Sequence, residues 1–256
     1  MALNFPSRFS TPLDPLVAAL RRLTPGSSED AEAIAALPHD TREAAQGETL
    51  IEIGSQSDCC CLLVSAYAYK HKVSARGMRQ IIAINLPGEL LNVQHALAWE
   101  TDYNSDVLRA GTIALIPRPA LRELIFTRPG VARGLWLSTL AESALSREWL
   151  LNVTRRDLTA RIAHLLCETS LRMGVTGDAD QNRYRIPLSP GQIASAAGSI
   201  QLYTQQALDD LEALGAVRVN EEHVEIADWS SLASAGEFDP QYLFEYRSPA
   251  LRAGQS

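Results

Sequence analysis

Three glutamines in the last third of the chain carry the side chains best suited to contact nucleobases. Gln201, Gln205 and Gln206 fall within two turns of a helix, so a helical segment would bring them together on its surface. A glutamine amide both donates and accepts, so it can form two hydrogen bonds with the adenine edge in the DNA major groove. These residues predict contact with A·T-rich DNA if the fold presents them outward.

The segment that would position these glutamines, residues 188–219, has the pattern of two short helices joined by a tight turn. Ser189 followed by Pro190 is a helix start, because the hydroxyl can cap free amides and proline already has a helical φ. Gly198 lies where the chain must turn sharply. A second helix is expected from about Ser199 to Leu214. The apolar residues of the two helices are Ile193, Ala194, Leu202, Leu208 and Leu211.

Gly215 is expected to end the second helix, and a two-stranded hairpin follows it. The hairpin is predicted by alternating apolar residues on both sides of a polar turn, namely Val217, Val219, Val224 and Ile226. Helix, turn, helix and hairpin form a winged helix-turn-helix, whose second helix lies in the DNA major groove. The alternative is that two short apolar helices joined at a glycine are only part of a protein core.

Other kinds of reactive site are not predicted. The sequence has no Ser-His-Asp set, glycine-rich phosphate loop or paired metal ligands at useful spacing, so an enzyme is the weakest of the functions considered. His95 has no histidine partner one helical turn away, and we expect a hydrogen-bonded residue rather than a haem or metal ligand. We therefore expect no metal site and no cofactor.

The cysteines favour a reducing compartment. Cys59, Cys60 and Cys61 are consecutive and cannot pair with one another without severe strain, and Cys167 is far away in sequence. On a strand, Cys59 and Cys61 would point to one face and Cys60 to the other. A redox role stays open for exposed thiols, but the favoured interpretation is that these are small buried apolar residues.

Length and composition indicate an ordinary globular protein of about two domains. The chain has 256 residues, of which 46% are hydrophobic and 21% charged, which is enough to build two cores. No apolar run approaches the roughly 18 residues that cross a bilayer, and the N-terminus does not resemble a secretion signal. The net charge of −7 argues against a protein that coats nucleic acid indiscriminately. We expect a cytoplasmic protein with no membrane partner.

The first half of the chain predicts short helices followed by a barrel. One or two helices are expected between Asp14 and Leu37, with a break at Pro25-Gly26. From Glu43 to Ile116, short β-rich runs alternate with glycine turns, which is typical of an antiparallel barrel or jelly roll. The predicted runs are residues 50–53, 60–64, 67–72, 80–84 and 113–116.

A long helix is predicted to begin at Thr127-Arg128-Pro129 and to continue to about Val153. Its apolar residues cover more than one stripe, so it can pack on the barrel with one side and on a second copy with the other. The alternative is a helix packed wholly within one chain; dimerisation is favoured. The residues expected at the dimer interface are Leu137, Leu140, Ala141, Ala144, Leu145 and Leu151. A further helix at 155–173, a solvated loop at 174–182 and a strand at 183–186 lead to the glutamine segment.

This order of barrel, long helix and winged helix-turn-helix resembles the Crp/Fnr family of bacterial transcription regulators. The resemblance covers roughly residues 15–243 and depends on seven loose motifs in the right order. They are Gly47-Glu48 with Gly54 and Asp58, Arg76 to Ile81, Leu86 to Glu89, Ala114 to Arg118, Arg155-Arg156, residues 188–219, and Gly236 to Leu243.

The resemblance implies an α+β fold in three parts: an N-terminal antiparallel β jelly-roll barrel with helices (1–126), a dimerisation helix (127–153) and a C-terminal winged helix-turn-helix domain (154–256). In that family the barrel senses a signal, and two recognition helices about 34 Å apart read a two-fold symmetric site. Double-stranded DNA and a second copy of the chain are the expected partners. RNA polymerase and a small-molecule effector are further candidates. We expect the barrel to act on the DNA-binding domain through the junction at 152–154.

The sequence departs from the cyclic-nucleotide members of the family at the phosphate site. Those members have a Gly-Glu pair after the Pro-Gly turn and an Arg-Ser pair further along. Here residues 90–94 read LLNVQ and residues 101–106 read TDYNSD. No arginine is present to clamp a phosphate and two carboxylates would repel it, so we expect no cyclic-nucleotide binding. The spaced cysteine cluster of the iron–sulfur members is also absent from the sequence.

The sequence also departs at the expected DNA contact. Gln206 takes the position of an arginine that usually grips guanine in this family. The residues expected to contact DNA are Ser189, Ser199, Gln201, Leu202, Gln205, Gln206 and Arg218. From Ser189 to Asp228 there are one arginine and seven acidic residues, a net charge of −6, so phosphate attraction from this unit is small. The arginines expected to offset part of it are Arg155, Arg156, Arg161, Arg183 and Arg185.

Two functional hypotheses of different kinds follow. The first is a dimeric, sequence-specific transcription regulator, gated by an effector other than a cyclic nucleotide. The alternative is a binding module that descends from such a regulator, has lost DNA binding, and contacts a protein or a small ligand. The intact order of the motifs and the turn residues Ala194 and Gly198 favour the regulator.

Overall fold

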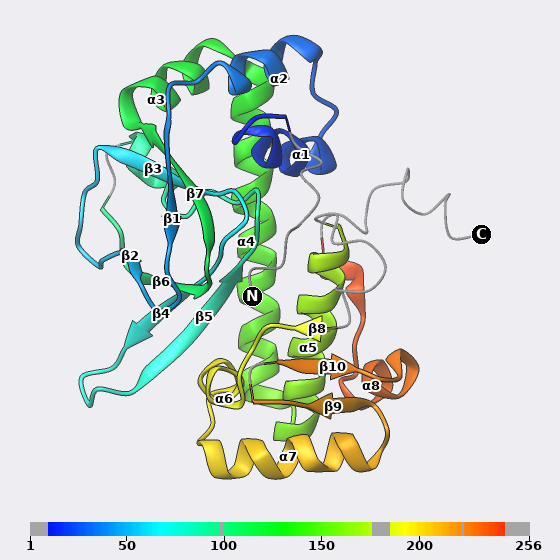
Figure 1. Cartoon of the computed structure of the whole chain (residues 1–256). Helices are drawn as coiled ribbons and strands as arrows, with labels where there is room; N and C mark the ends of the chain where they lie inside the picture. The colour runs from blue at the N-terminus through cyan, green and yellow to red at the C-terminus, as the bar shows by residue number, and fades with distance from the viewer. Residues whose placement is uncertain (1–9, 98–99, 176–184, 222, 244–256) are drawn as a thin grey trace.

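The computed structural model describes residues 10–97, 100–175, 185–221 and 223–243. It consists of an antiparallel barrel, a long helix that runs down one side of it, and a winged helix-turn-helix at the far end of that helix (Figure 1). The expected α+β fold is confirmed. The predictions made for Arg183 and for the loop after Val175 lie outside the described residues.

The N-terminal segment forms two helices, α1 (Asp14–Leu23) and α2 (Ser28–Ala35). The side chain of Ser27 accepts a hydrogen bond from the backbone amide of Asp30 at 3.0 Å, which caps the second helix. Both helices contribute to one buried cluster with strands of the barrel and with α3 (Arg118–Thr127). They therefore close one end of the barrel.

Two antiparallel sheets make the barrel, with strand orders β1-β7-β3 and β2-β6-β4-β5. The strands are β1 (Asp40–Ala44), β2 (Thr49–Ile51), β3 (Cys59–Leu63), β4 (Tyr67–Val73), β5 (Arg79–Asn85), β6 (Asn104–Arg109) and β7 (Gly111–Pro117), and a 3-10 helix, η1, covers Val93–Leu97. The five predicted runs correspond to β2, β3, β4, β5 and β7. Strands β1 and β6 were not predicted, because β1 is mostly exposed and polar and β6 buries Ser105 and Asp106.

The long helix α4 covers Pro129–Arg155, and α5 (Leu158–Val175) begins after a short break. α4 packs closely on α1 at Gly134, where an added Cβ would lie 3.3 Å from the Cβ of Leu20. Figure 1 shows α4 passing behind the barrel and ending beside the winged domain. This helix therefore connects the two globular parts of the chain.

The winged domain begins at β8 (Arg185–Ile186) and contains α6 (Pro190–Ala197), α7 (Gln201–Ala213) and α8 (Trp229–Ala235). Its sheet has the order β8-β10-β9, with β9 at Val217–Val219 and β10 at Val224–Ile226, and a 3-10 helix, η2 (Pro240–Tyr242), follows. Ser189 and Gln192 form a reciprocal capping box at the start of α6. Gly198 ends α6 with a positive φ of 64°. The predicted helix start and turn are confirmed.

The winged domain and the barrel share a buried apolar cluster. Tyr69 and Ile84 of the barrel belong to the same cluster as Leu166 of α5, Ile193 of α6 and Leu208 of α7. A second cluster fills the barrel interior and does not include the winged domain. The outer face of the β4–β5 sheet therefore supports the winged domain directly.

Candidate nucleic-acid interface and domain junction

Helix α7 exposes the face that carries the glutamines. Its inner face buries Thr204, Ala207, Leu208 and Leu211 against the rest of the domain. Gln201, Gln205 and Gln206 are all exposed, and Gln205 Nε2 donates to Asp209 Oδ1 at 2.9 Å. Figure 1 shows α7 on the outer surface, at the end of the molecule furthest from α2. The fold therefore presents these three amides together to solvent.

Leu202 lies on the exposed face too, with 73% of its surface accessible. Leu208 and Leu211 are fully buried, although the sequence grouped them with Leu202. Nine residues are about two and a half turns of helix, so positions 202 and 211 are on opposite faces. Ile200 and Tyr203 are also more than half exposed, so the first turn of α7 combines apolar and amide side chains on one surface.

The other residues predicted to contact DNA have structural roles as well. Ser189 caps α6, and the half-buried Ser199 donates from Oγ to the backbone oxygen of Ile200 at 3.4 Å. Arg218 is exposed on β9, and its register partner on β10 is Glu225. Arg218 thus has an acidic residue opposite it, which reduces the positive charge that the wing offers.

Two of the arginines expected near the DNA backbone are used inside the protein. Arg156 pairs with Glu148 at 2.8 Å, and both side chains are mostly buried. Arg161 donates from Nη1 to the backbone oxygen of Ala197 at 2.7 Å, next to the turn of the helix-turn-helix. Arg155 and Arg185 are exposed. Fewer arginines are therefore available to offset the negative charge of the winged domain than the sequence indicated.

The long helix has an exposed apolar face. Trp136 is 71% accessible, and Leu140, Leu150 and Leu151 are also exposed. Leu137 and Ala144 are half-buried beside this face. The remaining two residues of the predicted interface, Ala141 and Leu145, line a cleft of about 110 Å³ between α4, α1 and β5. The seam, defined here as Trp136, Leu137, Leu140, Ala144, Leu150 and Leu151, faces away from that cleft.

An ion pair between a buried lysine and a partly exposed glutamate occupies the side of the barrel that faces α4. Lys70 on β4 donates to Glu142 on α4, and the Lys70 ammonium lies 4.5 Å from the ring centroid of Tyr103. Burial lowers the pKa of Lys70, but attraction to Glu142 and Tyr103 outweighs it, so the pKa is raised above its ordinary value. This pair could not be predicted from the sequence, because the two residues are 72 positions apart.

Cys60, Cys61 and His95 are buried and have structural roles, whereas Cys59 is only partly buried. Cys60 and Cys61 are buried in two different clusters, which confirms that they point to opposite faces of β3. Burial raises the pKa of the Cys60 thiol to about 11 and that of Cys61 to about 12, which removes the thiolate that oxidation requires. His95 is buried, and its Nδ1 accepts from the backbone amide of Ser57 at 3.2 Å. Over the described residues, no group of acidic, histidine or cysteine side chains could hold a metal.

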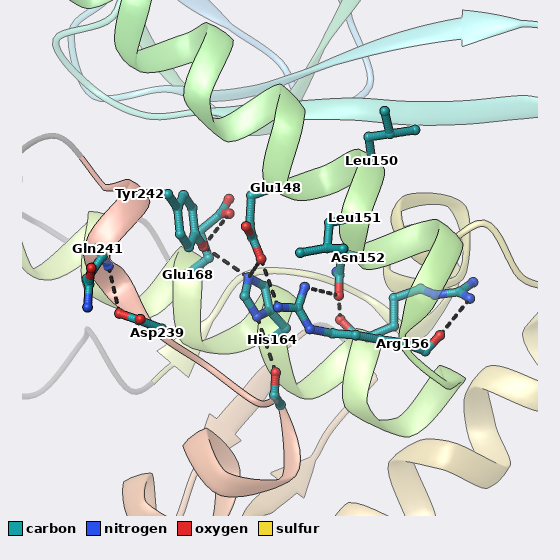
Figure 2. Close-up of polar contacts among 12 residues, drawn as sticks. Glu148, Leu150, Leu151, Asn152, Arg156, His164, Glu168, Asp239, Gln241 and Tyr242 are labelled. Carbon is teal, nitrogen blue, oxygen red and sulfur yellow. Dashed lines mark hydrogen bonds and ion pairs between the residues drawn. The ribbon is translucent and has the colours of Figure 1, made fainter.

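The junction between α4 and α5 is held by a polar network (Figure 2). Asn152 Nδ2 donates to the backbone oxygen of Arg161 at 3.1 Å, and its Oδ1 accepts from Arg156 at 3.3 Å. Arg172 of α5 donates to the backbone oxygen of Ile84 at 2.9 Å and pairs with Glu89 at 3.0 Å. These contacts tie α5 to both α4 and the barrel.

The C-terminal 3-10 helix completes this network. The hydroxyl of Tyr242 donates to Glu168 Oε2 at 2.8 Å, and Trp149 donates to Glu168 Oε1 at 2.9 Å. His164 Nδ1 donates to the backbone oxygen of Gly236 at 3.2 Å, and its Nε2 lies 3.1 Å from the Tyr242 hydroxyl (Figure 2). Burial raises the pKa of Glu168, whereas burial and the nearby Arg156 lower the pKa of His164 to about 4. His164 is therefore neutral at pH 7.

Two sequence relatives are transcriptional activators. The chain is 24% identical over 195 residues to a probable transcriptional activator of Rhizobium leguminosarum bv. viciae, covering 75% of this chain and 79% of the relative. It is 23% identical over 192 residues to the activator FnrL of Cereibacter sphaeroides, covering 73% of this chain and 76% of the relative. No protein-family model matches the chain.

The fold is similar to that of solved regulators. FixK2 from Bradyrhizobium japonicum matches with a TM-score of 0.68 and 19% identity, over 78% of this chain and 98% of that one. The two structures share a barrel, a connecting helix and a winged helix-turn-helix. The fold and the sequence relatives both support the resemblance of the chain to Crp/Fnr transcription regulators. Among the described residues, none of the helices is long and apolar enough to cross a membrane.

Proposed function

We propose that the protein is a homodimeric, sequence-specific DNA-binding transcription regulator that acts in the cytoplasm. The observation that carries this proposal is the exposed glutamine face of α7 on a helix-turn-helix with a complete capping box and a left-handed glycine turn. Gln201, Gln205 and Gln206 are the residues proposed to pair with adenine. Its relatives are transcription regulators rather than enzymes.

The seam on α4 supports the dimer. It places exposed leucines and a tryptophan on a face that neither the barrel nor α5 covers in the described part of the chain. Residues 137, 144 and 151 are seven apart, the spacing of a two-helix interface. A parallel pair of such helices would place two copies of α7 at the same end of the assembly. This arrangement fits a two-fold symmetric DNA site.

The Lys70–Glu142 pair supports regulation without a cyclic nucleotide. Lys70 is the buried cation on the barrel face that meets α4, and Glu142 already neutralises it. Lys70 and Glu142 therefore satisfy one another, and a phosphate that binds Lys70 would have to displace Glu142. An effector of another kind and RNA polymerase stay candidate partners of the regulator.

Selection of bound duplexes from a random DNA pool tests the proposal. We expect enrichment of a two-fold symmetric site that contains A·T pairs at the positions read by the glutamines. Gln206→Ala should lower affinity for that site about tenfold, because one bidentate base contact is lost. Gln46→Ala, which removes an exposed glutamine from the barrel, is the control and should have no effect. No enrichment over the pool would contradict the proposal.

A protein- or ligand-binding module is the second candidate. It is favoured by the net charge of −6 from Ser189 to Asp228 and by the internal use of Arg156 and Arg161. Such a module would select no DNA sequence. It would also show no dependence of DNA affinity on salt, whereas a regulator that contacts phosphates must show one.

A further inference from the structure

The first turn of α7 has an apolar character that the glutamines do not explain. Ile200, at the N-cap, makes no side-chain capping bond and is 51% exposed. Leu202 and Tyr203 are also exposed, although an isolated apolar residue on a surface needs no explanation. Here three of the first four residues at one helix end, Ile200, Leu202 and Tyr203, share the property. They lie next to Gln201 and Gln205 on the face proposed to contact DNA.

The phase of the helix places Leu202 on the outward stripe. Thr204, Ala207, Leu208 and Leu211 define the inner face. Leu202 and Gln206 are four residues apart and lie one above the other on the opposite side. A recognition helix contacts base edges with its N-terminal residues. Leu202 would therefore meet the floor of the major groove one turn ahead of Gln206.

A leucine side chain can recognise only one feature of the major groove. Three of the four bases present hydrogen-bonding groups alone, whereas thymine also presents its C5-methyl group. A G·C pair opposite Leu202 would lose water from its polar edge and gain no partner. A thymine methyl group would instead be buried against the leucine.

On the basis of the proposed function, we propose that Leu202 is a specificity-determining residue that reads a thymine methyl group. The operator half-site then has an A·T pair opposite Leu202, next to the adenine contacted by Gln206. The surrounding charge supports this assignment. Asp209, exposed two turns further along the same face, and the net charge of −6 limit the phosphate attraction, so base contacts must supply a larger share of the affinity.

Replacement of thymine by deoxyuridine tests the inference, because it removes only the methyl group. The selected operator is synthesised with each half-site thymine replaced in turn, and affinities are measured with the full-length protein. One position should weaken binding by about fourfold, the effect of losing one buried methyl group. The Leu202→Ala variant should bind the parent operator several-fold more weakly and should be insensitive to deoxyuridine at that position.

Leu214→Ala is the matched control, because Leu214 is an exposed leucine at the other end of α7. It should keep both the parent affinity and the sensitivity to deoxyuridine. If Leu202→Ala keeps that sensitivity, or if no thymine methyl contributes, the inference is wrong while the proposed function stands. If no operator is selected at all, both fail. Leu202 is exposed, so its replacement should leave the unfolding midpoint unchanged, which a thermal melt checks.

Discussion

Gln80, on strand β5 of the barrel, donates from its side-chain amide to the backbone oxygen of Ala196 in α6 at 3.1 Å. A second bond runs in the opposite direction, from Ser195 Oγ to the backbone oxygen of Arg79 at 3.2 Å. Gly198 lies so close that an added Cβ would be 3.3 Å from the Gln80 amide oxygen. The barrel therefore contacts the first helix of the helix-turn-helix directly, in addition to the expected junction at 152–154.

Gln80→Ala should loosen α6 from the barrel. Losing one hydrogen bond of this kind costs about 1 kcal/mol, so the fraction of molecules with a released α6 should rise about fivefold. Hydrogen exchange of the amides of α6 measures this release. Met78→Ala, at the exposed tip of the same hairpin, is the control. Equal exchange in both variants would show that β5 does not hold the winged domain.

Leu140→Asp combined with Leu151→Asp should yield a monomer. Each charge would be buried in the proposed interface without a partner, whereas both positions are exposed within one chain, so folding should be unaffected. Sedimentation velocity measures the change in mass. Leu97→Asp, which alters an exposed leucine of η1, is the control and should stay dimeric. A double variant that sediments like the unchanged protein would place the interface elsewhere.

Glu142→Ala should destabilise the barrel by about 2 kcal/mol, because it leaves the buried Lys70 ammonium without its partner. The loss is below that of a fully buried pair, since the Glu142 side chain is 45% exposed. Adding Lys70→Met should restore most of the stability, because an apolar side chain needs no partner there. Urea unfolding measures both effects, with Glu123→Ala at an exposed position of α3 as the control. If Glu142→Ala leaves the free energy of unfolding unchanged, the ion pair does not stabilise the barrel.

His164 should make the protein lose stability as the pH falls from about 6.5 to about 4. Burial and Arg156 depress its pKa to about 4 in the folded chain, so over this interval the unfolded chain binds a proton that the folded chain does not. The polar side chains next to it are Glu148 and Tyr242, and the Tyr242 hydroxyl in turn donates to Glu168. This proton uptake by the unfolded chain should lower the free energy of unfolding by about 3 kcal/mol between pH 7 and pH 4.

Unfolding curves of the His164→Gln variant between pH 4 and pH 7 check this expectation. The variant should show a flatter dependence on pH than the unchanged protein over that interval. His39→Gln, which alters a histidine bonded to the backbone oxygen of Leu37, is the control and should keep the original slope. An unchanged slope in His164→Gln would mean that this residue is not the buried neutral histidine described.

The helix-turn-helix could be predicted from the sequence almost to the residue, because its signals are local. Ser189, Pro190, Gly198 and Gly215 each act on the neighbouring backbone. The sequence alone does not determine that Leu202 points outward. It depends on which face of α7 packs on α5, and that is set by contacts distant in sequence.

The polar contacts that connect the domains could not be predicted. Gln80 and Ala196 are 116 positions apart, and Tyr242 and Glu168 are 74 apart. The sequence around each of these residues does not distinguish the residue from an ordinary surface residue. The strand β6 was missed for a related reason, since its buried Asp106 is satisfied by Thr49, Tyr69 and His71 from other strands.

The stoichiometry and symmetry of the complex with a selected duplex test the central claim most directly. Sedimentation equilibrium combined with footprinting on that duplex should show two chains bound. The protected region should be two-fold symmetric, with half-site centres about 34 Å apart. One chain per duplex, an unsymmetrical footprint, or no protected region would contradict the account of two α7 helices that read adjacent turns of DNA.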